Sequence, residues 1–111
     1  MENKELIVYI CNHGYGYAAM DAARTAGAGG GTILHGRSSL TSEHRTFFGV
    51  TIHPEKDLLF IVCLQNQKEA IMKAINEQYG ATSEARGVIF AIDVADSIGI
   101  NFDSSNLKPK Q

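Results

Sequence analysis

The residues from 26 to 37 combine a run of glycines with one arginine, in the order AGAGGGTILHGR. Glycine amides can approach a ligand closely because no side chain holds it away, and successive amides can turn toward an anion. Arg37 adds a guanidinium that can bind two phosphate oxygens at once. The segment therefore indicates a site for a small anion. A helix C-cap at Gly27, followed by a turn into a strand, explains the same glycines without a ligand.

Two further groups of side chains could do chemistry. The chain has four histidines that could together supply a metal site: His13, His35, His44 and His53. His35 and His44 flank a polar loop, but the sequence lacks ligand spacings such as HxH or HxxxH, so we interpret all four as separate turn or surface residues. Asp93 and Asp96 could act as paired acids, yet their position at a strand end favours turn and capping roles. We therefore expect no metal site and no catalytic residues.

The overall charge argues against nucleic acid as a partner. With ten basic and twelve acidic side chains and a formal net charge of -2, the 111-residue chain has no broad basic surface. Its length fits one domain with one modest core. Cys11 and Cys63 fall in apolar runs without CxxC spacing and are expected to be reduced and buried. A polar N-terminus precedes only a short apolar run, so we expect no signal peptide and a cytoplasmic location.

The elements that would position these residues follow from hydrophobic periodicity. Apolar runs of strand length cover residues 6–11, 32–34, 47–52, 58–64 and 88–94. Alanines that repeat every four residues predict a helix over residues 17–26, which can pack closely on a sheet. A second helix is expected to be capped by Asn66, with Glu69 in the capping-box position, and to end at Gly80. A loop and a turn are predicted over residues 37–45 and 53–57.

The order β-α-β-β-α-β predicts a ferredoxin-like α+β fold, in which four antiparallel strands form a sheet and two helices cover one face. The sequence offers no third layer for the opposite face. Because a strand as apolar as residues 58–64 needs cover on both sides, we expect a homo-oligomer. We also expect Gly30 to lie where two segments pack closely, so that a valine there would disturb the fold.

Five segments stand in an order that is typical of one family: AARTAGAGGGTI at 22–33, HGR at 35–37, FGVTI at 48–52, PEKD at 54–57 and GVIFAIDV at 87–94. Over about residues 5–100 the chain thus resembles the PII-like branch of the PII (nitrogen regulatory) signal-transduction superfamily. The resemblance implies a cytoplasmic homotrimer that binds adenine nucleotides in clefts between subunits. It also implies the following organisation: a domain over residues 1–103 with a T-loop at about 37–47 and a B-loop at about 80–87, and a flexible tail over 104–111.

The ligand-binding residues that the resemblance implies are Gly31, Thr32, Gly36, Arg37, Lys56, Arg86 and Gly87. Gly31 and Thr32 would lie beside the nucleotide base. Gly36 and Arg37 would meet phosphate at the start of the T-loop, and Lys56 would add a point charge. Arg86 and Gly87, in the B-loop, would reach phosphate across the subunit boundary.

Three positions depart from the nitrogen-regulatory members of the family. Where those members have a lysine after the B-loop glycine this chain has Val88, and where they have two arginines after the last strand it has Gly99 and Asn101. Each charged hydrogen bond contributes roughly 1.5–3 kcal/mol, so three missing cations weaken the hold on a triphosphate. We therefore expect ADP or AMP to be favoured over ATP, or a different small ligand, unless Lys108 and Lys110 of the tail replace those charges. No cofactor is expected to be obligatory.

The resemblance favours a regulator that is not an enzyme. Its T-loop would change on ligand binding and control a protein target, such as a membrane transporter or an enzyme of nitrogen metabolism. Residues 38–46 contain no tyrosine, so control by uridylylation is not expected. Two alternatives stay open: a metal-binding trimer like the CutA proteins, which share the architecture, and a weak nucleotide-hydrolysing enzyme that recruits Arg37, Lys56 and Glu84.

Overall fold

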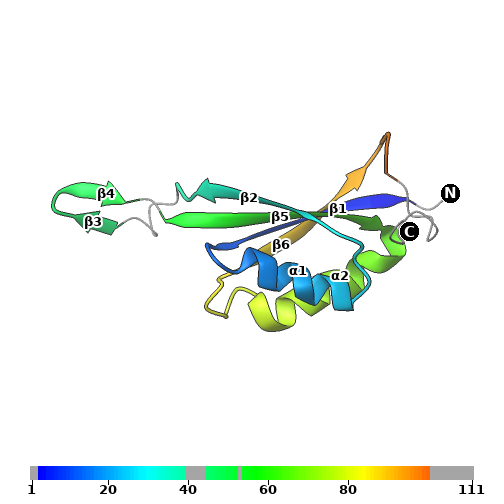
Figure 1. Cartoon of the computed structure of the whole chain (residues 1–111), viewed down its shortest axis with the longest axis horizontal. Helices are drawn as coiled ribbons and strands as arrows, with labels where there is room; N and C mark the ends of the chain where they lie inside the picture. Colours follow the sequence, from blue (N-terminus) through cyan, green and yellow to red (C-terminus); the bar gives the residue numbers. More distant parts are fainter. Residues whose placement is uncertain (1–2, 40–44, 53, 101–111) are drawn as a thin grey trace, which may run out of the picture.

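A four-stranded antiparallel sheet, with both helices on one of its faces, forms the body of the molecule (Figure 1). The computed structural model describes residues 3–39, 45–52 and 54–100. Along the chain the elements are β1 (Lys4–Asn12), α1 (Gly16–Thr25), β2 (Thr32–Arg37), β3 (Arg45–Phe47), β4 (Val50–Ile52), β5 (Glu55–Leu64), α2 (Gln65–Tyr79) and β6 (Val88–Val94). The sheet has the strand order β2-β5-β1-β6. Apart from the β3–β4 pair, this is the βαββαβ ferredoxin-like fold that the sequence predicts.

Alternation along the strands places the core between the sheet and the helices. In β1, Ile7, Tyr9 and Cys11 are buried, and in β5 the neighbouring positions Leu59, Ile61 and Cys63 are buried in the same layer. The helices contribute small or branched side chains that allow close approach: Ala19, Met20 and Ala23 from α1, and Ile71 and Ile75 from α2. Cys11 and Cys63 are free thiols, as expected. No helix in the described part of the chain is long and apolar enough to cross a membrane.

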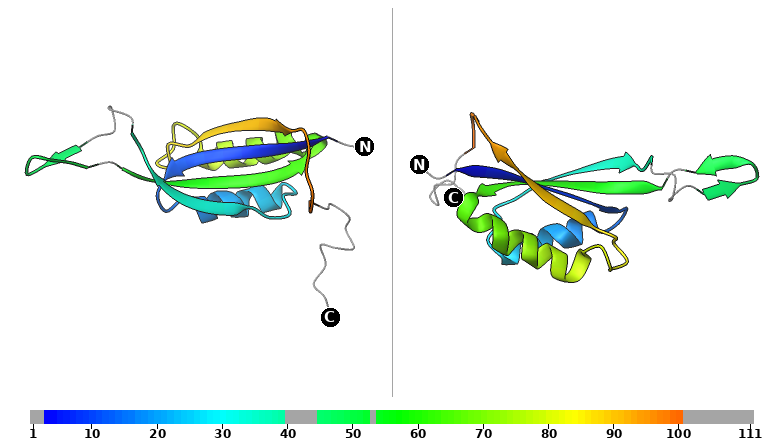
Figure 2. Two further views of the ribbon diagram at one scale, coloured as in Figure 1. Left: turned by 90° about the horizontal axis from the view of Figure 1, so that it is seen from above. Right: turned by 180° about the vertical axis from the view of Figure 1, so that it is seen from behind.

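The opposite face of the sheet has no covering layer within the described protomer (Figure 2). Pairing across the sheet aligns apolar residues in rows on this face, and we call it the open face: Val88, Ile10, Leu58 and Leu34 form one row, and Phe90, Val8 and Phe60 the next. Val88 is 57% exposed, Phe90 42% and Ile92 51%. Side chains of this size leave a continuous apolar surface in contact with solvent.

The segment between β2 and β5 differs from the predicted strand over residues 47–52. Arg45 pairs with Ile52 and Phe47 pairs with Val50, so β3 and β4 form a separate hairpin beyond the ends of β2 and β5 (Figure 1). The two turn residues, Phe48 and Gly49, both have positive φ angles, of 51° and 78°. This is the backbone of a two-residue type I′ turn, which matches the twist of a hairpin. The single predicted strand is therefore wrong.

The start of α2 also differs from the prediction. The helix begins at Gln65, and the side chain of Gln67 accepts a hydrogen bond from the backbone N–H of Leu64 at 2.9 Å. Gln67 therefore does the capping that was expected of Asn66 and Glu69. The end of the helix at Gly80 agrees with the prediction.

Candidate functional site

A hollow of about 400 Å³ opens on the open face, at the end of the sheet nearest the β3–β4 hairpin. Its lining combines an apolar floor with cations and small polar groups: Ile10, Gly36, Arg37, Ser38, Ser39, Lys56, Leu58, Arg86 and Val88. Among the described residues, this lining contains no carboxylate. Although the whole chain carries a net charge of -2, the hollow is locally positive. An apolar wall with a few converging charged groups is typical of a site for a small organic anion.

Strand pairing positions the cations on β2 and β5. Gly36 lies opposite Lys56, and Arg37 lies opposite Glu55. Lys56 is only 8% exposed, and its Nζ donates a hydrogen bond to Oδ1 of Asn12 at 2.9 Å. Gly36 and Leu58 both line the floor of the hollow, and a Cβ on Gly36 would lie 3.2 Å from Cδ1 of Leu58. A side chain at position 36 would therefore fill part of the hollow. The ammonium group is thus held in place by the sheet itself.

The loop from α2 to β6 brings the third cation. Asn12 holds this loop, since its backbone N–H donates to the carbonyl of Ala85 at 2.8 Å and its side-chain amide donates to the carbonyl of Glu84 at 2.9 Å. Arg86 follows with a φ of 48°, in the left-handed region that non-glycine residues rarely adopt. The same asparagine therefore orders both Lys56 and the loop that carries Arg86.

Four of the seven predicted ligand-binding residues line the hollow: Gly36, Arg37, Lys56 and Arg86. The other three are not among its lining residues, and two of them are glycines because a side chain would not fit. A Cβ on Gly31 would meet Sδ of Met20 at 2.8 Å, and a Cβ on Gly87 would collide with Tyr9 and with the carbonyl of Tyr79. Thr32 begins β2 and pairs with Phe60, away from the hollow.

The expectation of close packing at Gly30 is wrong within the protomer. A Cβ built on Gly30 meets nothing within 4 Å, and the residue that needs to be glycine is its neighbour Gly31. Met20, Leu59 and the carbonyl of Phe60 all approach Gly31 to 3.0 Å or less from the position of such a Cβ. Within the glycine run, Gly31 is therefore the position at which β2 packs against the core too closely for a side chain.

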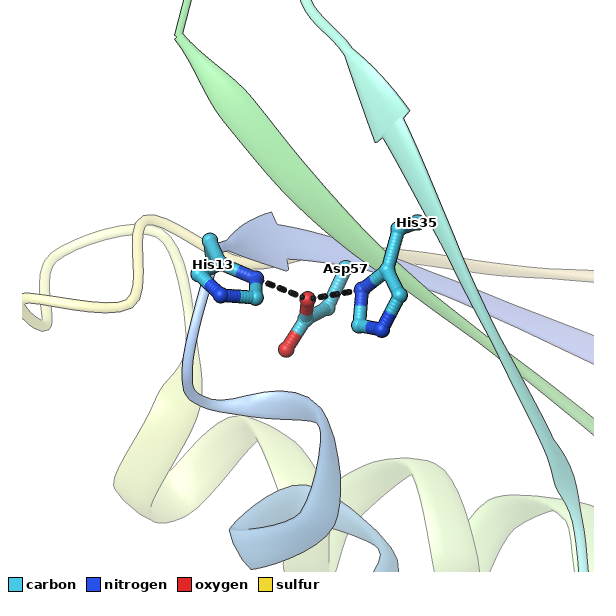
Figure 3. A group of neighbouring side chains, drawn as sticks. All are labelled: His13, His35 and Asp57. Atoms are coloured by element: carbon cyan, nitrogen blue, oxygen red, sulfur yellow. Dashed lines mark hydrogen bonds and ion pairs between the residues drawn. The ribbon is translucent and has the colours of Figure 1, made fainter.

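A second cluster lies on the helix side of the sheet and joins His13, His35 and Asp57 (Figure 3). Nδ1 of His13 and Nδ1 of His35 both contact Oδ1 of Asp57, at 2.8 Å and 3.0 Å. The two rings meet edge to face, with their centroids 5.2 Å apart. The interpretation of His13 and His35 as separate surface residues is therefore wrong. His44 and His53 lie outside the described residues.

Asp57 is 1% exposed, and it joins β5 to the start of α1. Its Oδ2 accepts hydrogen bonds from the backbone N–H groups of Gly14 and Gly16, at 2.9 Å and 3.0 Å. Burial by itself raises the pKa of this carboxyl, but the amides of Gly16 and Gly14 and the two histidines outweigh that effect and lower the pKa to about 2. Asp57 is therefore a carboxylate at neutral pH.

The sequence does not link His13 to Asp57, because their separation of 44 positions along the chain matches no motif. A topological signal was present. β5 runs antiparallel to both β1 and β2, so the start of β5 meets the ends of those two strands. Polar residues at three strand ends that meet in space could have been grouped on that basis.

Comparison with solved structures places this fold among known proteins. No protein-family model and no curated protein matches the sequence. Arabidopsis thaliana PII bound to citrate is similar with a TM-score of 0.64 and 20% identity, over 90% of this chain and 82% of that one. The Bacillus subtilis GlnK–ATP complex has a TM-score of 0.63 and 13% identity, over 88% of each chain. CutA from Synechococcus elongatus has a TM-score of 0.61 and 9% identity, over 85% of this chain and 79% of that one.

These similarities define the class of protein by its fold. The chain has the ferredoxin-like fold of the Arabidopsis PII, Bacillus subtilis GlnK and CutA structures. At identities of 9–20%, the comparisons assign no ligand.

Proposed function

We propose that this chain is a ligand-sensing regulatory protein that binds an adenine nucleotide or another small anion in the hollow of the open face. The observation that carries the proposal is the convergence of Arg37, Lys56 and Arg86, from three separate segments, on one concave surface whose described lining residues include no carboxylate. Guanidinium and ammonium groups are the side chains best suited to phosphate oxygens. The apolar residues Ile10, Leu58 and Val88 would contact the base or ribose.

The number of phosphate groups that the nucleotide can carry depends on how many cationic side chains line the hollow. GlnK of Bacillus subtilis was determined with ATP, and the Arabidopsis protein with citrate, so both proteins take polyanions. Here Val88 lines the hollow at the position where a lysine would add a further charged contact in the resembling family. The ligand is therefore ADP or AMP in preference to ATP. A tricarboxylate is the second class to test.

Assembly into a homotrimer would complete the site. The apolar rows of the open face include Phe90 and Ile92, which are 42% and 51% exposed in the protomer. Burial of such a surface contributes roughly 25 cal/mol for each Å² of apolar area, which favours association with further copies of the chain. Each hollow would then be closed by a neighbouring subunit.

The output of the sensor would be the segment from residue 38 to 54. It leaves the sheet directly after Arg37 and returns directly before β5, so both of its ends adjoin the hollow. Phe48 at the hairpin tip is 91% exposed. We propose that ligand binding changes this segment and thereby its affinity for a protein target in the cytoplasm, such as a membrane transporter or an enzyme of nitrogen metabolism. No catalytic step is part of the proposal.

The test is calorimetric titration of the whole chain with ATP, ADP, AMP, cyclic AMP, citrate, 2-oxoglutarate and bicarbonate, supported by thermal-shift measurements. A ligand that binds only the folded state raises its apparent stability. Replacement of Arg37 by alanine should weaken nucleotide affinity at least about tenfold, the loss expected for one charged hydrogen bond.

Arg24→Ala is the matched control. Arg24 is paired with Asp21 on α1 at 3.1 Å, on the side of the sheet that faces away from the hollow. Its replacement removes the same charge and should leave affinity unchanged. Equal losses in the two variants, or no saturable binding by any of these anions, would contradict the proposed site.

A further inference from the structure

The cluster of His13, His35 and Asp57 is separate from the hollow, because it lies on the other face of the sheet beside the start of α1 (Figure 3). We propose that these three side chains bind one divalent first-row transition metal ion, with Zn²⁺ as the representative ion. Two imidazole nitrogens and one carboxylate oxygen are the donor set that borderline cations such as Zn²⁺, Co²⁺ and Ni²⁺ prefer.

The distances suit a common ion. The three donor atoms lie within 4.8 Å of one another, and each Nδ1 lies 2.8–3.0 Å from Oδ1 of Asp57. Ligands arranged tetrahedrally around one ion at about 2.0–2.2 Å are separated by about 3.3–3.6 Å, so each Nδ1 would move away from Oδ1 by about 0.3–0.8 Å. The ion would take the position between the three atoms, with each imidazole in the tautomer that carries its proton on Nε2 and presents the lone pair of Nδ1 to the ion.

The surroundings hold the carboxylate in position. The amides of Gly14 and Gly16 bind Oδ2 of Asp57, which leaves Oδ1 directed at the two rings. A side chain on Gly16 would approach that Oδ2 to 3.0 Å, so the helix start fits the carboxylate closely. Hydrogen bonds to a ligating carboxylate fix its orientation and are a regular part of metal sites.

Access and charge also favour binding. The side chains of His13 and His35 are 53% and 64% exposed, whereas that of Asp57 is 2% exposed. An ion can therefore arrive from solvent and meet a buried anion behind two mobile rings. Three protein ligands leave at least one coordination position for water or for an external group.

The experiment uses the whole chain, freed of metal by a chelator and then titrated with Zn²⁺ against a chromophoric competitor. We expect one ion for each chain. His13→Gln and His35→Gln should each reduce affinity by about 10-fold or more, since each removes one of three ligands. Titration with Co²⁺ should give visible absorption bands that change in both variants, which reports the donor set directly.

His44→Gln and His53→Gln are the matched controls, because they make the same change at histidines that the proposed site does not use. Thermal unfolding of each variant without metal shows that the fold is retained. An affinity that depends on His44 or His53 but not on His13 would overturn the assignment, as would weak binding without a defined stoichiometry.

Discussion

Lys56 and Asp57 are consecutive residues of β5, and their side chains belong to opposite faces of the sheet. Lys56 lines the hollow on the open face, while Asp57 contacts the start of α1 and the two histidines. The same alternation separates Gly36 from His35 on β2. Two candidate sites thus lie back to back across a single layer of backbone, and substitutions at neighbouring positions address one or the other.

Gly31→Ala should destabilise the protein, because the new methyl group would lie 2.8 Å from Sδ of Met20 and 3.0 Å from the carbonyl of Phe60. Overpacking of this kind costs about 1–3 kcal/mol. Gly30→Ala is the control, since its methyl group meets nothing within 4 Å in the protomer. Urea unfolding of both variants measures the difference. Equal stabilities would show that β2 does not enter the core at Gly31.

Arg86→Gly should change stability and ligand affinity in opposite directions. Arg86 has a φ of 48°, which costs a residue with a side chain roughly 1–2 kcal/mol, and glycine removes most of that cost. The flexibility of glycine in the unfolded chain offsets part of the gain, so we expect an increase of about 0.5–1 kcal/mol in the free energy of unfolding. Nucleotide affinity should fall because one cation is lost. Thermal unfolding and calorimetry test the two effects, and unchanged affinity would remove Arg86 from the site.

Phe90→Lys should disrupt self-association. Phe90 lies on the open face in the edge strand β6, next to Val8 in the sheet, and a lysine there would place a charge in the proposed subunit interface. Tyr17→Lys is the control, because Tyr17 is 72% exposed on α1, in the helix layer. Sedimentation velocity should show a trimer for the wild type and the control, and a smaller species for Phe90→Lys. A wild-type chain that stays monomeric at all concentrations would rule out the assembly.

Asp93→Asn should stabilise the protein at neutral pH. Asp93 lies opposite Glu5, a 3% exposed carboxylate that Lys68 contacts at 2.7 Å. The interaction with Glu5 raises the pKa of Asp93, while hydrogen bonding with Asp93 and Lys68 lowers the pKa of Glu5. A raised pKa means that the folded state binds the Asp93 proton more tightly than the unfolded state does. Ionised Asp93 therefore costs stability above the pKa, and this cost disappears as it is protonated at low pH.

The stabilisation by Asp93→Asn should accordingly be largest near pH 7 and should shrink as the pH falls toward the ordinary aspartate value of 3.8. Urea unfolding across this range measures it. The control is Asp96→Asn, which removes the same charge three positions away. A gain that is equal in both variants, or that is constant with pH, would show that Glu5 and Asp93 do not interact.

Most of the fold could be predicted because its elements carry clear periodic signals. The runs at 6–11 and 58–64 become the two central strands, and the stripe of Ile71 and Ile75 becomes the buried face of α2. The hairpin was missed for a physical reason. Type I′ turns normally contain Asn-Gly or Asp-Gly. This turn has Phe48 in the left-handed region instead, so the sequence showed no turn signal and the apolar run was predicted to be one strand.

Asp57 was assigned to a turn because Pro, Glu, Lys and Asp are typical turn residues and are depleted in strands. Pairing with β1 on one side and β2 on the other overrides that preference, and β5 begins at Glu55. The histidine cluster depends on this strand, so no search by sequence spacing could find it. The cations of the hollow were named from family motifs, and their placement on one surface needed the folded chain.

The strand order has a consequence for how the chain folds. Asn12 pairs with Lys56, 44 positions later, and Lys4 at the other end of β1 pairs with Val94 in the last strand. No two neighbouring strands of the main sheet are joined by a tight turn. Proteins dominated by such distant pairings fold on the order of milliseconds to seconds. The chain loses the conformational entropy of closing long loops before the contacts between the strands can stabilise it. During synthesis, β1 can pair with β5 first, and it gains its second partner only after α2 and β6 have also left the ribosome.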